Sequence, residues 1–235
     1  TIDGTQLASA REKDRTTTYG MTLGGPIIKN KLFFFVNAEY SKIPSIANTW
    51  RARADEKVKP TAEASLSYAT VADMQKVSAF VKEKYGYDTG SFTSFPADES
   101  NMKLLARIDW NINPKNHLAL RYNFTKNVSW SAPNASSMDG GTRSAYARMS
   151  LYSMSYANSM YSMDNLVHSL SLDLNSRITD NLSNQFLATF SKLDDVRGTN
   201  SSEFPFIDIM DGTGTNTPYI SLGYELFTWN NAVHN

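Results

Sequence analysis

The 235-residue sequence contains no cysteine, and this absence excludes several kinds of site at once. Without thiols the chain has no disulfide framework, no cysteine nucleophile and no thiolate metal site. It also has no long apolar run, since the longest bulky stretch is Leu32 to Val36, whereas a membrane-spanning helix needs about 20 residues. Any membrane role would therefore depend on β-strands.

Net charge is absent as well, because 23 lysine and arginine residues balance 23 aspartate and glutamate residues. No global positive field points to nucleic acid, so we expect no nucleic-acid partner. Residues Thr1 to Gly4 have neither the charged nor the apolar region of a signal peptide. We therefore expect either a protein that is not exported or a piece of a longer one.

What the sequence does contain is strict two-residue alternation, clearest over residues 101–125. Leu104, Ala106, Ile108 and Trp110 occupy even positions, while most odd positions are charged or amide residues. Because successive side chains of a strand point to opposite faces, each strand here has one apolar and one polar face. Such segments of about ten residues are typical of transmembrane β-barrels, and soluble sandwiches share them.

The same alternation predicts six strands, near residues 16–23, 32–41, 102–111, 117–125, 166–175 and 182–191. Gly24-Gly25-Pro26 is expected to break the first of them. Connections alternate in length: three are short, and three form long loops at residues 42–100, 126–165 and 192–235. Unstructured loops beyond about 12–15 residues are uncommon in compact soluble domains. Short turns that alternate with long extracellular loops are typical of outer-membrane barrels.

The pattern therefore favours an all-β, antiparallel, up-and-down transmembrane barrel segment of six to seven strands. Within the first long loop, residues 61–85 predict a helix that Gly86 ends. The second loop, near residues 129–163, has no clear period, but its tyrosines indicate some packing. In the third loop, residues 208–217 are rich in turn residues and precede a predicted strand at residues 219–224.

Four stretches resemble TonB-dependent outer-membrane receptors, most closely the Oar-like branch, whose members often carry a carboxypeptidase-regulatory-like domain. The most specific is residues 22–37, TLGGPIIKNKLFFFVN, with a Gly-Gly-Pro turn, a basic turn and a Phe-rich strand. Residues 105–123, the loop segment 84–88 and residues 178–182 are similar to the same family. The resemblance implies a bacterial outer-membrane barrel of about twenty-two strands with an internal plug, energised through TonB.

The resemblance also implies partners. These are the TonB complex, reached through a plug that this sequence does not contain, outer-membrane lipid and lipopolysaccharide, and a surface lipoprotein. The ligands it allows are an oligosaccharide, a peptide or protein, or a siderophore. Because no plug, TonB box or closing strand is visible, and single-chain barrels begin at eight strands, we expect a segment from the early barrel.

Two alternatives stay open at this stage. One is a passive porin or adhesin-like barrel without energy coupling. The other is a soluble β-sandwich binding module. An enzyme is not expected, because the three histidines lack metal-site or triad neighbours and are interpreted as strand or rim residues. They are His117, His168 and His234. Asp194-Asp195 is interpreted as a strand end and Asp211-Gly212 as a plain turn, so no metal and no cofactor is predicted.

Candidate ligand contacts fall into two sets. Polar residues on the charged faces of the strands are Glu39, Lys103, Arg107, Asp109, Arg121 and Asp173. Aromatic loop residues are Trp50, Trp130, Tyr161, Tyr219 and Trp229. The alternative for the first set is pairing across strands or with a plug, and for the second set packing among the loops. Arg107 and Arg121 are expected to be neighbours, with Asp109 offsetting their like charge.

Overall fold

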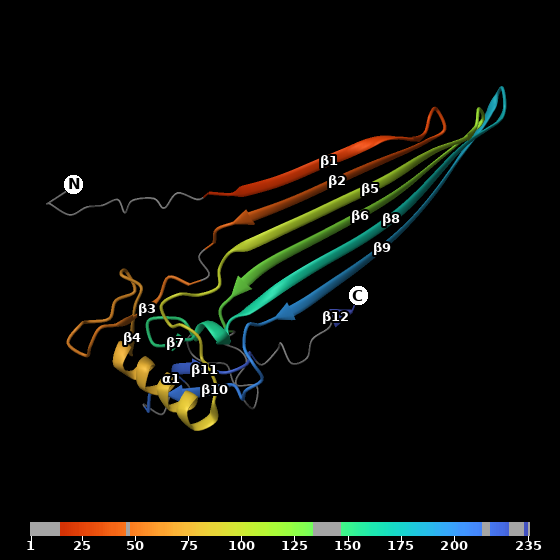
Figure 1. Cartoon of the computed structure of the whole chain (residues 1–235). Helices are drawn as coiled ribbons and strands as arrows, with labels where there is room; N and C mark the ends of the chain where they lie inside the picture. The colour runs from red at the N-terminus through yellow and green to blue at the C-terminus, as the bar shows by residue number, and fades with distance from the viewer. Residues whose placement is uncertain (1–14, 46–47, 134–146, 213–216, 226–232, 235) are drawn as a thin grey trace.

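The computed structural model describes residues 15–45, 48–133, 147–212, 217–225 and 233–234. Its main element is an antiparallel sheet in which six long strands follow one another in chain order (Figure 1). They are β1 (Thr17–Ile28), β2 (Leu32–Ile43), β5 (Glu99–Asn113), β6 (Asn116–Ser131), β8 (Tyr161–Thr179) and β9 (Leu182–Gly198). The short β12 (Val233–His234) pairs with β9. The predicted antiparallel, up-and-down order is confirmed, and the described strands do not close into a barrel.

The pairing register aligns apolar residues with apolar residues, and mainly polar residues with polar ones, across all six strands. One row on the apolar face joins Leu23, Val36, Ala106, Tyr122, Leu170 and Phe190. The adjacent row on the opposite face joins Gly24, Phe35, Arg107, Arg121, Ser171 and Thr189. A slip by one residue would exchange the two sets, so this register defines one continuous apolar face and one mainly polar face.

The predicted break at Gly24-Gly25-Pro26 is wrong, because β1 runs on to Ile28. Gly24 lies opposite Phe35, and a Cβ at Gly24 would approach the Phe35 ring to 3.2 Å. A residue without a side chain therefore fits beside this ring. Pro26 has no N–H to donate, which an edge strand such as β1 tolerates. The remaining strands also extend beyond their predicted bounds.

The three short turns lie together at one end of the sheet, and the long loops leave from the other end (Figure 1). Asn30 adopts a left-handed φ of 60° in the first turn. Neighbouring hairpins are joined by Asn111 N–H, which donates to Lys31 O at 2.8 Å, and by Arg177 N–H, which donates to Lys115 O at 2.8 Å.

Three long loops fold together into a second unit, which we call the loop module and define as the described residues of 48–98, 147–160 and 199–225. Its secondary structure comprises β3 (Arg51–Arg53), β4 (Leu66–Thr70), α1 (Val71–Tyr85), β7 (Met154–Ser155), the 3-10 turn η2 (Ala157–Ser159), β10 (Ile207–Met210) and β11 (Pro218–Leu222). β7, β10 and β11 form a small sheet, as do β3 and β4.

The predicted helix is confirmed for Val71–Tyr85, while the residues before it form β4 and a turn. Thr70 caps its N-terminus by accepting a hydrogen bond from Asp73 N–H at 3.1 Å. Gly86 ends it with a φ of 69°, which glycine adopts without strain. The predicted strand at residues 219–224 corresponds to β11, whereas residues 207–210, in part predicted as turn, form β10.

The hydrophobic core of the described chain lies in the loop module and not in the six-stranded sheet. It consists of Ala69, Met74, Val81, Tyr87, Met154, Tyr156, Ile220 and Leu222. Tyr156 is fully buried and donates from its hydroxyl to Met74 O at 2.7 Å, which confirms the predicted packing of tyrosines in the second loop. Burial raises the pKa of this tyrosine well above its usual range.

By contrast, no buried apolar side chain among the described residues belongs to the six long strands. Phe190 is 66% exposed and Tyr19 67% exposed, both on the apolar face. No described helix or second sheet covers either face along the strands (Figure 1). The residues that the structure describes include no helix with the length and hydropathy needed to cross a membrane.

Candidate functional site

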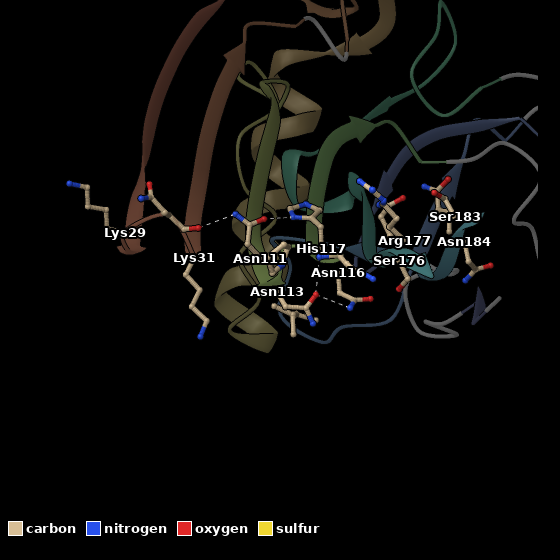
Figure 2. A pocket seen from close by; sticks show the side chains of 16 residues that line it. Lys29, Lys31, Asn111, Asn113, Asn116, His117, Ser176, Arg177, Ser183 and Asn184 are labelled. Carbon is tan, nitrogen blue, oxygen red and sulfur yellow. Dashed lines mark hydrogen bonds between the residues drawn. The ribbon is translucent and has the colours of Figure 1, made fainter. Parts of the chain in front are cut away.

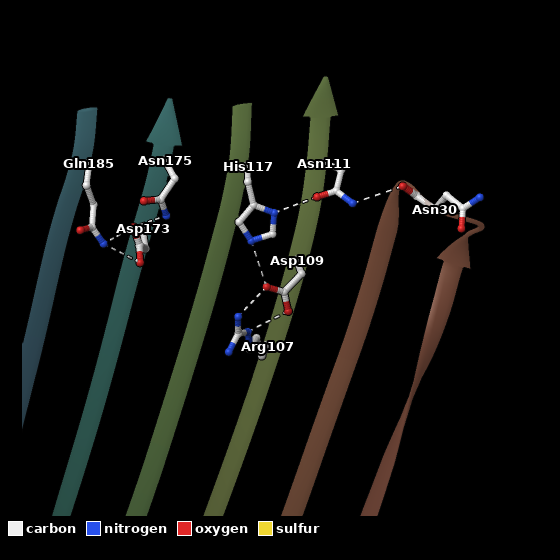
Figure 3. A network of polar contacts seen from close by, with 8 residues as sticks. All are labelled: Asn30, Arg107, Asp109, Asn111, His117, Asp173, Asn175 and Gln185. Carbon is white, nitrogen blue, oxygen red and sulfur yellow. Dashed lines mark hydrogen bonds and ion pairs between the residues drawn. The ribbon is translucent and has the colours of Figure 1, made fainter. Parts of the chain in front are cut away.

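The polar face carries a connected network near the short turns (Figure 3). Arg107 donates to both oxygens of Asp109, from Nε to Oδ2 and from Nη2 to Oδ1, each at 2.7 Å. His117 Nε2 lies 3.4 Å from Asp109 Oδ1, and its Nδ1 lies 2.9 Å from Asn111 Oδ1. Asn111 Nδ2 in turn donates to Asn30 O at 3.2 Å. The network therefore links the turn between β1 and β2 to β5 and β6 and fixes the orientation of Asp109.

Arg121 lies directly opposite Arg107 in the register, as predicted. Asp109 offsets the charge of Arg107, but Arg121 has no hydrogen bond or ion pair among the described residues. Asp173 lies nearby on β8 and accepts from Asn175 at 3.0 Å and from Gln185 at 3.0 and 3.1 Å. Arg121 is therefore available to an anionic group that approaches the polar face.

The remaining predicted pair on this face, Glu39 and Lys103, forms an ion pair at 3.3 Å nearer the loop end. Both side chains are well exposed, so the pair contributes little to stability. The structure thus brings Arg107, Asp109, Arg121 and Asp173 together and leaves Glu39 and Lys103 apart from them. The arrangement can bind and orient polar groups.

An open recess of about 1020 Å³ lies beside this network, at the end where the short turns meet (Figure 2). Its charged lining residues are Lys29, Lys31, Lys115 and Arg177, accompanied by asparagine and serine side chains. Of these cations, Arg177 is paired, to Asp180 at 2.6 Å. With no carboxylate in its lining, the recess is chemically suited to acidic groups.

The predicted loop aromatics do not form one site. Trp50 packs against the core of the loop module, and Trp130 lies near the end of β6. Tyr161 opens β8, where the guanidinium carbon of Arg197 lies 4.1 Å from its ring centroid. Trp229 lies outside the described residues. Tyr219 lines a pocket.

That pocket, which we call the tyrosine pocket, has a volume of about 390 Å³ and is formed by all three long loops. It is lined by Arg53, Tyr68, Tyr152, Met210, Asp211 and Tyr219. The rings of Tyr68 and Tyr152 stack with centroids 5.6 Å apart and planes 10° apart. Five of the six residues were not predicted as site residues, because the sequence has no motif that joins them.

The hydroxyl of Tyr219 connects this pocket to α1 by donating to Asp73 Oδ2 at 2.6 Å. This hydrogen bond, followed by one from Thr70 Oγ1, lowers the pKa of Asp73 below its usual value of 3.8. Burial and the same carboxylate raise the pKa of Tyr219 to about 12. Ionised Asp73 and neutral Tyr219 therefore stabilise the folded loop module.

We expect this pair to give the loop module an acid-sensitive contribution to its stability. Since the folded pKa of Asp73 lies below the unfolded one, the contribution is complete above about pH 4 and is lost as the pH falls through the folded value. Hydrogen exchange of the α1 amides at pH 3 and pH 7 measures this loss. Tyr219→Phe should return the pKa of Asp73 toward 3.8 in an NMR titration, and an unchanged pKa would contradict the assignment.

Two of the histidines lie in the six-stranded sheet, His117 on β6 and His168 on β8. His168 Nδ1 lies 2.8 Å from the Tyr122 hydroxyl, and His234 lies in β12. Asp208 forms an ion pair with Arg148, and Asp194 with Lys192. Among the described residues no group of histidines and carboxylates is arranged to hold a metal ion. In comparisons with known proteins, the chain matches no family model, no curated protein and no solved structure.

Proposed function

We propose that this chain is part of the barrel of a TonB-dependent outer-membrane transporter, which captures a ligand with its long loops and imports it with energy transmitted by TonB. The observation that carries the proposal is the apolar face, continuous over six strands and uncovered by any described element. The choice of family rests on the resemblance of residues 22–37 to TonB-dependent outer-membrane receptors. No metal or cofactor is needed for this function.

The apolar face has the height that a bilayer requires. On β2 it extends from Leu32 to Tyr40, nine residues, and transmembrane strands need about 9–11. Trp110 lies in the row of Leu32, and Tyr19 pairs with Tyr40 at the opposite limit. Aromatic residues at both limits are typical of the girdles that flank the apolar band of outer-membrane barrels.

Charged side chains appear on this face toward its loop end. Three ion pairs lie there: Lys42 with Asp98 at 2.6 Å, Lys126 with Asp164 at 2.9 Å, and Lys192 with Asp194 at 2.9 Å. One row inside this limit, His168 and Lys192 lie opposite each other on the apolar face, and the His168 ring is hydrogen-bonded to Tyr122. The transition from apolar rows to ion pairs corresponds to the boundary between acyl chains and headgroups.

The polar face favours a plugged barrel over a passive porin. Although most of its residues are polar, Phe35 is 38% exposed there and Leu187 is 62% exposed. Exposed apolar side chains suit contact with protein better than contact with a water-filled channel. Together with Arg121, they would meet a plug inside the barrel.

Site-directed labelling tests the orientation of the two faces, and a chain without cysteine is well suited to it. In the full-length protein in membranes, a spin label at Leu172→Cys should collide with oxygen and be protected from a water-soluble nickel complex. The matched control is Ser171→Cys, the preceding residue on the polar face. A label at Leu172 that is protected from both oxygen and nickel would contradict a lipid-facing position and favour the soluble sandwich, in which a second sheet covers the apolar face.

A second experiment separates a plugged transporter from a passive porin. A hydrophilic maleimide applied to intact cells should react slowly at Leu187→Cys if a plug fills the barrel. Rapid reaction, comparable to that of an exposed loop position such as Glu56→Cys, would favour the open porin. Glu56 is exposed in the turn that follows β3.

A further inference from the structure

We propose that the tyrosine pocket of the loop module binds a pyranose ring of a neutral oligosaccharide. The inference deepens the proposed function by naming the ligand class, and its biological meaning rests on that function. The volume of about 390 Å³ lies in the range of small-molecule sites. Among the described loop residues, this pocket brings together aromatic rings, a guanidinium and a carboxylate.

Part of the pocket is preformed, because backbone carbonyls hold the Arg53 side chain and a backbone hydrogen bond fixes the position of β4. Arg53 donates from Nε to Tyr68 O at 2.9 Å and from Nη1 to Glu56 O at 3.2 Å. The amide of Tyr68 donates to Leu151 O at 2.7 Å, which ties β4 to the segment that carries Tyr152. Side chains that are already ordered lose little conformational entropy when a ligand binds.

The groups left for a ligand combine an apolar ring surface with hydrogen-bonding edges. Tyr68 is 43% exposed, and its hydroxyl has no partner among the described residues. Nη2 of Arg53 likewise has no hydrogen-bond partner among the described residues. Tyrosine rings pair an apolar face with a polar tip. A pyranose ring is complementary, since it has an apolar C–H face and a rim of hydroxyl groups.

The charge of the lining argues for a neutral ligand. Arg53 and Asp211 contribute one charge of each sign. An anionic ligand would be repelled by Asp211, and a cationic one by Arg53, whose guanidinium carbon already lies 5.6 Å from the centroid of the Tyr68 ring. A purely aromatic ligand would desolvate these polar groups without pairing them, which is unfavourable. Hydroxyl groups both donate and accept hydrogen bonds, so they suit a lining that carries one guanidinium and one carboxylate.

Calorimetry on the full-length protein in detergent tests the inference. The probes are four neutral hexasaccharides, built from α-1,4-glucose, β-1,4-glucose, β-1,4-mannose and β-1,4-N-acetylglucosamine, and one acidic hexamer of galacturonic acid. We expect at least one neutral probe to bind and the acidic hexamer not to bind. Absence of binding by all neutral probes, or preference for the acidic hexamer, would overturn the inference.

Variants locate the binding. Tyr68→Ala should weaken the affinity for the neutral probe about tenfold through loss of the ring. Tyr68→Phe keeps the ring and removes a hydroxyl that has no protein partner, so it should fold normally and weaken binding about threefold to tenfold. The control is Tyr85→Ala, at a tyrosine 56% exposed outside the pocket, and it should bind as the parent does. Unchanged affinity in both Tyr68 variants would place the sugar elsewhere and overturn the inference.

Uptake of the bound probe by intact cells separates the two proposals. If binding depends on Tyr68 but no energy-dependent uptake occurs, the sugar-binding proposal stands and the transporter proposal is contradicted. The opposite outcome is also possible. If the labelling experiments show the expected strand orientation and a plugged barrel, but no sugar binds, the proposal for the tyrosine pocket is contradicted and the transporter proposal stands.

Discussion

Replacing Arg148 by alanine should open the loop module far more than any exposed substitution. Arg148 is 0% exposed, and it donates to both carboxylate oxygens of Asp208 at 2.8 and 2.7 Å. Its guanidinium carbon also lies 4.8 Å from the centroid of the Phe206 ring. Removing one partner of a buried ion pair leaves an uncompensated charge and typically costs about 3–5 kcal/mol.

The measurement is hydrogen exchange of the backbone amides in β7 and β11, which should accelerate by roughly two to three and a half orders of magnitude. Arg177→Ala is the matched control, because Arg177 pairs with Asp180 at 2.6 Å while both side chains are exposed. Such surface pairs contribute about 0–1 kcal/mol. If Arg148→Ala accelerated exchange no more than Arg177→Ala, the pair would not hold the second and third loops together.

If the chain is part of a membrane barrel, as proposed, introducing a lysine at Leu120 should impair assembly of that barrel. Leu120 lies in the apolar row that joins Phe34, Ile108, Leu172 and Ala188 across five strands. A lysine near the bilayer midplane costs about 2–4 kcal/mol. We expect a corresponding loss of folded protein in urea titrations of the full-length protein in lipid vesicles.

Ala119→Lys is the control for this substitution, since Ala119 precedes Leu120 on β6 and belongs to the opposite face. It lies between Asp109 and Asp173 in the register, so the new ammonium group gains carboxylate neighbours. Its effect should be small. In a protein surrounded by water Leu120→Lys would also be nearly neutral, because Leu120 is 37% exposed and exposed substitutions usually change stability by less than about 0.5 kcal/mol. Equal effects of the two lysines would therefore contradict the membrane proposal.

The two-residue alternation was sufficient to predict the six strands, their antiparallel order and their two faces. This is a local property, because each residue's face follows from its neighbours along the chain. The helix ending at Gly86 was also predictable, since its apolar spacing and its cap lie within one segment. The prediction that Arg107 and Arg121 are neighbours followed from the hairpin between β5 and β6, which fixes the register.

Tertiary structure alone decided where the core lies and how the loops combine. Tyr156 reaches Met74 across 82 positions, Arg148 reaches Asp208 across 60, and Tyr219 reaches Asp73 across 146. No local pattern marks such pairs, because each residue alone resembles an ordinary loop residue. The run of β1 through Gly24-Gly25-Pro26 was likewise decided by a neighbour, because these residues pair with Phe33, Phe34 and Phe35 of β2. The sequence by itself thus determined the sheet and its faces, whereas the tyrosine pocket exists only because three distant loops bury a common core.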